Sequence, residues 1–260
     1  MPNRLKQLLA QGKVVRVFGM GQLCSPKLVE IVGMSNGFHA VWFDQEHAGL
    51  TIEQIENASR AARGVGLESF VRLTATDYAT VMRPLEAGAG GIMAAQVRSV
   101  HEVKQIIEWT KFFPLGLRGV NGGGVDGGYG SIPLREYFRT ANENSFVAIQ
   151  IEHAQAVEVV DQIASVKEVD VLFVGPADLT QSLGIPGDMN HPRLWEALEQ
   201  VARAAKAHGI HWAILPRDVP FAQRCLEMGC RMFSLGVDVW IAHRGIRTYL
   251  DEFADFFQMH

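Results

Sequence analysis

Several sequence signals are missing from this chain of 260 residues. No apolar run approaches the length of about 18 residues that a membrane span needs. The N-terminal segment MPNRLKQLLAQGK is amphipathic and lacks the apolar core of a secretory signal. The three cysteines, Cys24, Cys225 and Cys230, have no zinc-type spacing and suit a reducing compartment. We therefore expect a cytoplasmic protein that does not enter a membrane.

The chain also lacks an excess of charge of either sign. It has 24 basic and 28 acidic side chains, with a net charge of -4 and an isoelectric point near 6.1. This balance gives no reason to expect binding to nucleic acid or to an anionic membrane. The glycine-rich run at residues 116–130 lacks the Gly-Lys-Ser/Thr ending of a phosphate-binding loop, which disfavours nucleotide hydrolysis. A small-molecule partner is the better expectation.

Strand-like and helix-like segments alternate along the chain. Hydrophobic residues make up 48% of the chain, enough for a large buried core. Runs rich in β-branched and aromatic residues predict eight strands, at residues 14–20, 39–43, 69–73, 91–95, 146–151, 169–174, 211–215 and 231–235. Helical periodicity lies at residues 26–34, 51–64, 77–87, 100–111, 154–164, 192–208, 219–228 and 237–257, whereas residues 112–133 are irregular. This alternation predicts a single (β/α)8 barrel over residues 1–260, with a doubly wound open sheet as the alternative.

Two acids follow neighbouring strands at the centre of this pattern. Glu152 follows the strand at 146–151, and Asp178 follows the strand at 169–174. A helix between two strands makes them parallel, so both acids should reach the same edge of the sheet. Two converging anions favour a hard divalent cation such as Mg²⁺ or Mn²⁺ between them. The alternative is that both are solvated loop residues, with Asp178 at a helix start.

Other reactive side chains fall at the same predicted rim. Asp44, Glu46 and His47 follow the second strand, and Arg72 ends the third. Asp44 is placed to orient and polarise the His47 ring for proton transfer, although a histidine in an exposed loop is often inert. Arg72 is suited to holding an oxyanion beside a metal, or to an ion pair with Glu46 or Glu86.

Gly175-Pro176-Ala177-Asp178 turns a strand into a helix start, where free backbone N–H groups can receive a carboxylate. Arg118 is either an anchor for an anionic substrate or a surface charge. No lysine lies at the carboxyl end of a predicted strand, where a Schiff-base aldolase needs one. Carbon–carbon bond chemistry on this chain should therefore be metal-dependent.

Separated motifs in this order resemble the metal-dependent (class II) pyruvate aldolases of the HpcH/HpaI family, over nearly the whole chain. The motifs are FDQEHA at residues 43–48, VR at 71–72, GLRG at 116–119, QIE at 150–152 and GPADL at 175–179. The resemblance implies reversible cleavage of a 4-hydroxy-2-oxo acid, or a 2-keto-3-deoxy sugar acid, into pyruvate and an aldehyde through a metal-stabilised enolate.

The resemblance also implies a role for each matching residue. Glu152 and Asp178 would hold Mg²⁺, Mn²⁺ or Co²⁺, Arg72 would stabilise the enolate oxygen, and His47 with Asp44 would transfer protons. Gln150 and the backbone of Gly175, Ala177 and Asp178 would bind pyruvate. Glu86 stands where the family often has Asp, at a position linked to the aldehyde.

The family resemblance further implies a homo-oligomer, a trimer or hexamer, in which the last helix packs on a neighbouring barrel. The apolar tail with Phe253, Phe256 and Phe257 fits that arrangement. Two other functions stay open: a citrate-lyase-type lyase acting on CoA esters, which the absence of a clear basic nucleotide-binding patch disfavours, and a non-catalytic protein that binds a metal and a 2-oxo acid.

Overall fold

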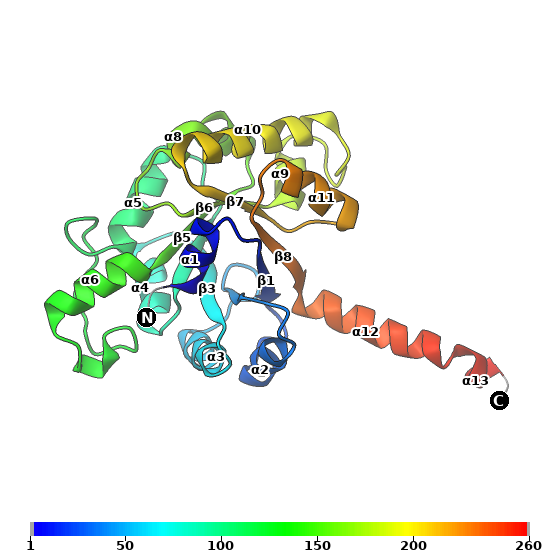
Figure 1. The fold of residues 1–260 in the computed structure, drawn as a ribbon, viewed down its shortest axis with the longest axis horizontal. Coiled ribbons are helices and arrows are strands. Elements are labelled where there is room, and N and C mark those ends of the chain that lie inside the picture. Colours follow the sequence, from blue (N-terminus) through cyan, green and yellow to red (C-terminus); the bar gives the residue numbers. More distant parts are fainter. Residues whose placement is uncertain (1–2, 259–260) are drawn as a thin grey trace.

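The computed structural model describes residues 3–258 and is built around a closed barrel of eight parallel strands in sequential order (Figure 1). The strands are β1 (Val15–Met20), β2 (Ala40–Asp44), β3 (Glu68–Thr74), β4 (Gly91–Ala95), β5 (Phe146–Ile151), β6 (Val171–Val174), β7 (His211–Ile214) and β8 (Met232–Val237). The pairing of β8 with β1 closes the barrel. The predicted (β/α)8 architecture is confirmed, and the open doubly wound sheet is excluded.

Helices connect consecutive strands around the barrel, and further helices precede the first strand and follow the last. They are α1 (Arg4–Ala10), α2 (Pro26–Met34), α3 (Ile52–Gly64), α4 (Tyr78–Glu86), α5 (Val100–Thr110), η1 (Gly128–Gly130), α6 (Leu134–Asn144), α7 (Ala154–Glu158), α8 (Val160–Ala164), α9 (Pro176–Ser182), α10 (Pro192–His208), α11 (Val219–Glu227), α12 (Asp238–Glu252) and α13 (Ala254–Gln258). Thr51 caps helix α3, since its side chain accepts the N–H of Gln54.

Three helical segments differ from the sequence prediction. The predicted helix at 154–164 is two short helices, because Val159 leaves the helical conformation at φ -112° and ψ 15°. β-branched residues on both sides of this position weaken the helix there. The closing helix is likewise divided, at Phe253. Helix α6, which buries Tyr137 and Asn142, lies in a stretch for which no element was predicted.

The core has two layers. Side chains pointing into the barrel include Trp42, Phe70, Phe146 and Phe173, and a second layer fills the space between the strands and the helices. Parallel strands buried on both faces read as nearly continuous apolar runs, which is the pattern in β5 and β6.

Lys111 lies near the end of the barrel at which the strands begin. Its side chain is fully buried, and Nζ donates to the carbonyl oxygens of Asn142 and Ser145, both at 2.9 Å, with Glu168 at 3.6 Å. Burial lowers the pKa of Lys111 from 10.5 to about 8. Because catalytic groups of such barrels lie at the opposite end, this lysine is badly placed for Schiff-base chemistry.

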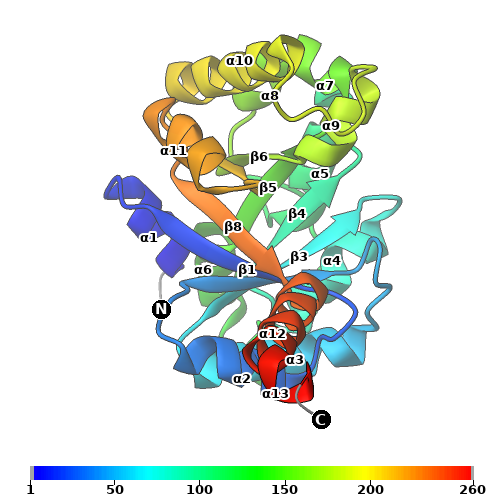
Figure 2. The same ribbon diagram turned by 90° about the vertical axis from the view of Figure 1, so that its right-hand side faces the viewer.

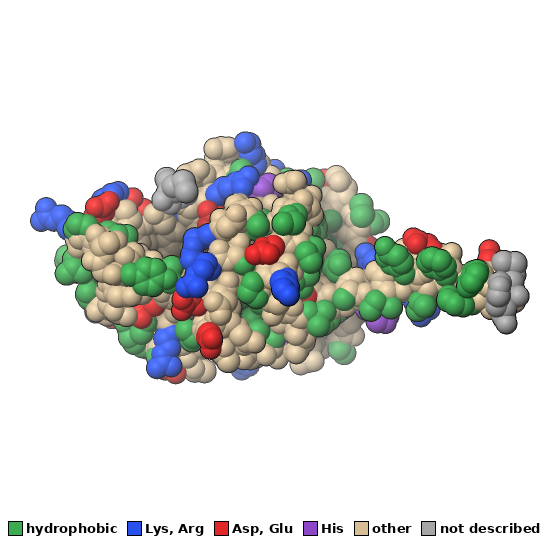
Figure 3. Space-filling model, turned by 90° about the horizontal axis from the view of Figure 1, so that it is seen from below, with side chains coloured by type: hydrophobic (Ala, Val, Ile, Leu, Met, Phe, Trp, Pro, Cys, Tyr) green, Lys and Arg blue, Asp and Glu red, His purple; other side chains and the backbone are tan. Residues whose placement is uncertain are grey.

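Helices α12 and α13 project away from the barrel as an arm (Figures 1 and 2). Apolar side chains cover much of this arm (Figure 3), among them the exposed Trp240, Ile246, Tyr249, Leu250 and Phe257. Across residues 3–258, no helix combines the length and hydropathy that crossing a membrane requires.

We predict that Lys111 makes stability pH-dependent. Its folded-state pKa lies below its ordinary value, so the folded protein binds fewer protons than the unfolded chain at intermediate pH. The free energy of unfolding of the wild type, relative to that of Lys111→Met, should therefore increase as the pH is raised from about 8 to about 10. Urea unfolding across this range measures the difference. Lys104→Met, a change at an exposed position of α5, should show no such trend, and an identical trend in both variants would contradict the prediction.

Candidate active site

Arg72 and Asp44 form the best-defined charged pair at the carboxyl end of the barrel. The register of β2 and β3 sets these two residues opposite each other. Asp44 accepts from Arg72 with both oxygens, at 3.1 Å from Nε and 2.6 Å from Nη2. The guanidinium also lies over the Trp42 ring, 4.9 Å from its centroid. These contacts fix the orientation of Arg72 before any substrate binds.

Glu46 lies between Arg72 and His47. Its Oε2 is 3.5 Å from Arg72 Nε and 3.7 Å from His47 Nε2. Asp44 was expected to orient the His47 ring, but its Oδ1 accepts the backbone N–H of His47, at 3.2 Å, and the ring faces Glu46 instead. Asp44 is turned away because it is already engaged by Arg72. No ion pair joins Arg72 to Glu86 in the described part of the chain.

Glu152 is buried under the start of α9. Its Oε1 accepts the N–H of Gln96 at 2.7 Å, and its Oε2 accepts from Gln150 Nε2. A Cβ on Gly175 would lie 2.8 Å from both Gln150 Nε2 and Glu152 Oε2, so a larger residue there would displace these two side chains. Burial, followed by the charges of Glu46 and Asp178, raises the pKa of Glu152 to about 7.

The donor set fits a hard divalent cation. Asp178 lies in the first turn of α9, close enough for its charge to act on Glu152. Gln150 Oε1 is a buried oxygen without a hydrogen-bond partner. Within residues 3–258 no cluster of three or more His, Cys, Asp or Glu side chains is arranged to hold a metal. The protein would thus supply two carboxylates and leave the other positions to substrate and water, as magnesium sites often do.

Most of these groups line a cavity of about 640 Å³, whereas Glu46 and the buried Glu152 are not among its wall residues. Its walls include the predicted residues Asp44, His47, Arg72, Gln150, Gly175, Ala177 and Asp178. They also include residues that the sequence analysis did not single out, namely Trp42, Met93, Phe173, Leu215, Arg217, Trp240, Ile241 and Arg244. Trp42 could have been found from the period of a strand, because it lies two positions before Asp44 and points the same way. The residues of α12 had no such signal.

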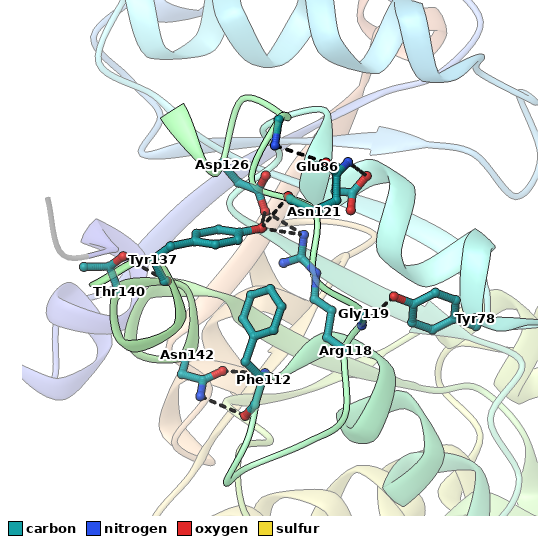
Figure 4. Close-up of polar contacts among 11 residues, drawn as sticks. Tyr78, Glu86, Phe112, Arg118, Gly119, Asn121, Asp126, Tyr137, Thr140 and Asn142 are labelled. Carbon is teal, nitrogen blue, oxygen red and sulfur yellow. Dashed lines mark hydrogen bonds and ion pairs between the residues drawn. The ribbon is translucent and has the colours of Figure 1, made fainter. Parts of the chain in front are cut away.

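Glu86 and Arg118 do not belong to this cavity within one chain. Glu86 ends α4, which carries the chain back to the amino-terminal end of the barrel, and its Oε2 accepts from Asn121 at 3.0 Å. Arg118 is buried, with Nη2 2.6 Å from Asp126 Oδ2, and it stacks on Phe112 (Figure 4). Arg118 therefore anchors the glycine-rich segment and is not the surface charge that the sequence analysis gave as its alternative role, and the roles in substrate binding stay predictions.

Residues 21–244 match the family model of the HpcH/HpaI aldolase/citrate lyase family. The 5-keto-4-deoxy-D-glucarate aldolase of Enterobacter sp. (strain 638) is 31% identical over 97% of both chains. The chain belongs to the HpcH/HpaI family.

Solved structures of similar proteins agree with this assignment. The HpcH/HpaI aldolase from Desulfitobacterium hafniense DCB-2 is 32% identical, with a TM-score of 0.87 over 95% of this chain and 96% of that one. Citrate synthase SbnG is 28% identical, with a TM-score of 0.88 over 98% of both chains. The family resemblance drawn from the sequence motifs is confirmed.

In this HpcH/HpaI family member a buried acid that the sequence analysis missed supports the cavity wall. Asp238, the first residue of α12, accepts with Oδ2 from the N–H groups of Gly21, at 2.7 Å, and Leu23, at 2.8 Å. Gly21 in turn lies against Asp44, since a Cβ built on it would be 3.8 Å from the Asp44 Cβ. Asp238 therefore joins α12 to the loop beside the Arg72 pair.

We predict that Asp238→Ala leaves two backbone donors unpaired. The variant should lose about 2 kcal/mol or more of unfolding free energy, and the amides of Gly21 and Leu23 should exchange with solvent about tenfold faster or more. Denaturant unfolding and hydrogen exchange measure the two effects. Asp251→Ala, at an exposed position of α12, is the control. Unchanged exchange at both amides in Asp238→Ala would rule out this role.

Proposed function

We propose that this protein is a divalent-metal-dependent aldolase that reversibly cleaves a 4-hydroxy-2-oxo acid, 2-keto-3-deoxy sugar acids included, into pyruvate and an aldehyde. The observation that carries the proposal is that Asp178 and Arg72 line one cavity while the buried Glu152 lies directly behind its wall, next to the lining residue Gln150. The name of the 31% identical relative, 5-keto-4-deoxy-D-glucarate aldolase, supports the same class of reaction.

Glu152 and Asp178 would hold the cation, with Mg²⁺, Mn²⁺ and Co²⁺ as candidates. Such an ion draws electron density from the 2-oxo oxygen of the substrate and thereby makes the neighbouring carbon more acidic. Gln150 lies beside Glu152 and has an unpaired oxygen available to the site.

Arg72 supports the negative charge that develops on the 2-oxo group. Its guanidinium is already held by Asp44 and Trp42, so little reorganisation is needed when charge appears. The substrate carboxylate would lie on the turn at Gly175, where the N–H groups of Ala177 and Asp178 begin α9. Gly175 lets the substrate approach Glu152 without a side chain between them.

His47 is the candidate proton carrier. Its ring lines the cavity and is largely exposed, with Glu46 at 3.7 Å. In the cleavage direction His47 takes the proton of the 4-hydroxyl, the bond between C3 and C4 breaks, and the new aldehyde leaves. A proton delivered to C3 then completes pyruvate.

The structural relative citrate synthase SbnG has a name that indicates a different reaction. Carbon–carbon bond chemistry on a CoA ester is therefore the second candidate function. Assay of the chain with acetyl-CoA or citryl-CoA distinguishes the two. A non-catalytic binder of metal and 2-oxo acid would bind pyruvate in calorimetry without exchanging its methyl protons.

The proposal includes assembly and location. The apolar arm of α12 and α13 would pack on a neighbouring barrel in a trimer or hexamer, which light scattering would show as a mass above the 28.7 kDa of one chain. Cys24, Cys225 and Cys230 are all free thiols, as expected for the cytoplasm, where disulfides are rare.

We predict that chelation abolishes pyruvate release from a 4-hydroxy-2-oxo acid and that Mg²⁺, Mn²⁺ or Co²⁺ restores it. Glu152→Gln should lower the affinity for the cation at least about tenfold, because it removes one of the two carboxylates that would bind it. Metal titration by calorimetry measures the affinity, with Glu199→Gln on the exposed face of α10 as control. Full activity in the presence of a chelator would contradict the metal mechanism.

We predict that Arg72→Ala keeps the metal affinity and lowers kcat by about 10²-fold or more, because it removes the cation that faces the developing charge. Steady-state kinetics and metal titration on one sample separate the two effects. Arg203→Ala, at an exposed position of α10, should behave as wild type. A near-normal kcat in Arg72→Ala would remove this residue from the mechanism.

A further inference from the structure

We propose that Ser234 of β8 is a positioning residue for Arg72 and acts on it through the indole of Trp42. Ser234 holds the indole ring in one orientation, and the ring in turn supports one face of the Arg72 guanidinium. This inference rests on the proposed aldolase function and deepens it, because it identifies what keeps Arg72 in the orientation that the reaction needs.

The Trp42 side chain links β2 to β8 inside the barrel. Its Nε1 donates to Ser234 Oγ at 2.9 Å, a contact between residues 192 positions apart in the chain. Ser234 is fully buried and points into the barrel, like Met232 two positions earlier in β8. Trp42 is only 3% exposed, so its N–H depends on an acceptor from the protein. The Ser234 hydroxyl supplies that acceptor and thereby sets the direction of the ring.

Gly19 leaves the space through which this indole passes β1. Strand β1 lies between β2 and β8, and its register sets Gly19 beside Trp42. A Cβ on Gly19 would lie 2.6 Å from Cζ2 and 2.9 Å from Cε2 of Trp42. These are atoms of a rigid ring, so a side chain at this position would displace the whole indole. Three neighbouring strands therefore hold the ring in one place.

Asp44 and Trp42 restrain different motions of Arg72. Asp44 accepts from Nε and Nη2, which fixes the directions of two N–H groups within the guanidinium plane. The Trp42 ring lies against the face of the guanidinium, 4.9 Å from ring centroid to Cζ, and opposes tilting of that plane. Glu46 Oε2 is 3.5 Å from Nε and offers a competing partner. Without a fixed ring, the guanidinium can turn toward Glu46.

The contacts of Trp42 are more specific than an apolar core requires. Its neighbours inside the barrel, such as Val17 and Phe70, make only apolar contacts with their side chains. Trp42 also lines the cavity, contacts a cation and has its one polar atom paired with Ser234. Small displacements of a group that faces developing charge reduce the rate strongly. A serine that fixes the ring therefore affects turnover without touching the substrate.

Exchange of the pyruvate methyl protons with heavy water, in protein loaded with Mg²⁺, measures enolate formation without the aldehyde. Ser234→Ala should lower kcat for this exchange about fivefold, because the ring loses its anchor, and leave KM for pyruvate and the affinity for Mg²⁺ unchanged. In the Arg72→Ala background the same substitution should change kcat less than about twofold. Equal losses in both backgrounds would show that Ser234 does not act through Arg72, and would overturn the proposal.

Trp42→Phe keeps an aromatic ring beside Arg72 and removes the indole N–H. It should lower kcat as much as Ser234→Ala does, and the double variant should be no slower than either single variant. Additive losses would overturn the hydrogen bond as the link between Ser234 and Arg72.

Ser59→Ala and Trp212→Phe are the matched controls. Each removes a buried polar atom that has no hydrogen-bond partner within residues 3–258, and neither residue lines the cavity. Both variants should keep the wild-type kcat. A loss in either control as large as that in Ser234→Ala would show a general disturbance of the core and would overturn the specific role of Ser234.

The Nε–H group of Arg72 gives a second readout that does not depend on turnover. Its order parameter, measured by NMR relaxation, should be lower in Ser234→Ala than in wild type, whereas that of the buried Arg118 should be unchanged. An unchanged order parameter at Arg72 would overturn the positioning role. Absence of exchange in Mg²⁺-loaded wild type would instead overturn the aldolase function, and the Arg72 signal would still decide whether Ser234 holds the guanidinium.

Discussion

Repulsion among acids at one rim of the barrel is the constraint on which the site depends. Closure of a parallel barrel brings the carboxyl ends of β2, β5 and β6 together, so Asp44, Glu46, Glu152 and Asp178 cannot avoid one another. Arg72 compensates part of this charge, and burial leaves Glu152 with a raised pKa. The remaining negative charge is what a divalent cation would neutralise, which links the electrostatics of the rim to metal chemistry.

The charged groups at the two ends of the barrel have different roles. At the amino-terminal end α1 buries Leu5 and Leu9, Lys111 binds backbone carbonyl groups, and Arg118 holds the glycine-rich segment through Asp126. Charged groups there are paired inside the protein and serve stability. At the carboxyl end the charged residues Asp44, Arg72 and Asp178 line a cavity. Charged side chains therefore stabilise the fold at the amino-terminal end, whereas at the carboxyl end they form the candidate active site.

Helix α12 connects the cavity with the surface of the molecule. Its first turns carry the buried Asp238 and then Trp240 and Arg244, which line the cavity, while its later turns form the exposed apolar arm. Packing of that arm on a neighbouring barrel would also hold this wall of the cavity in place. Other parts of the wall come from β2, β3 and β5, which the closed sheet holds in place.

The sequence by itself determined the barrel, because alternating strand and helix periodicities are compatible with few other folds. It also placed Asp44, His47, Arg72, Glu152 and Asp178 at one rim, because the carboxyl ends of parallel strands share one edge of the sheet. Only the tertiary structure decided which partners these side chains take: Asp44 turns to Arg72 instead of the His47 ring because the register of β2 and β3 sets the two opposite each other. It also removed Glu86 and Arg118 from the cavity of the chain and brought Arg244 into it. Such contacts join residues far apart in the chain, and local periodicity carries no information about them.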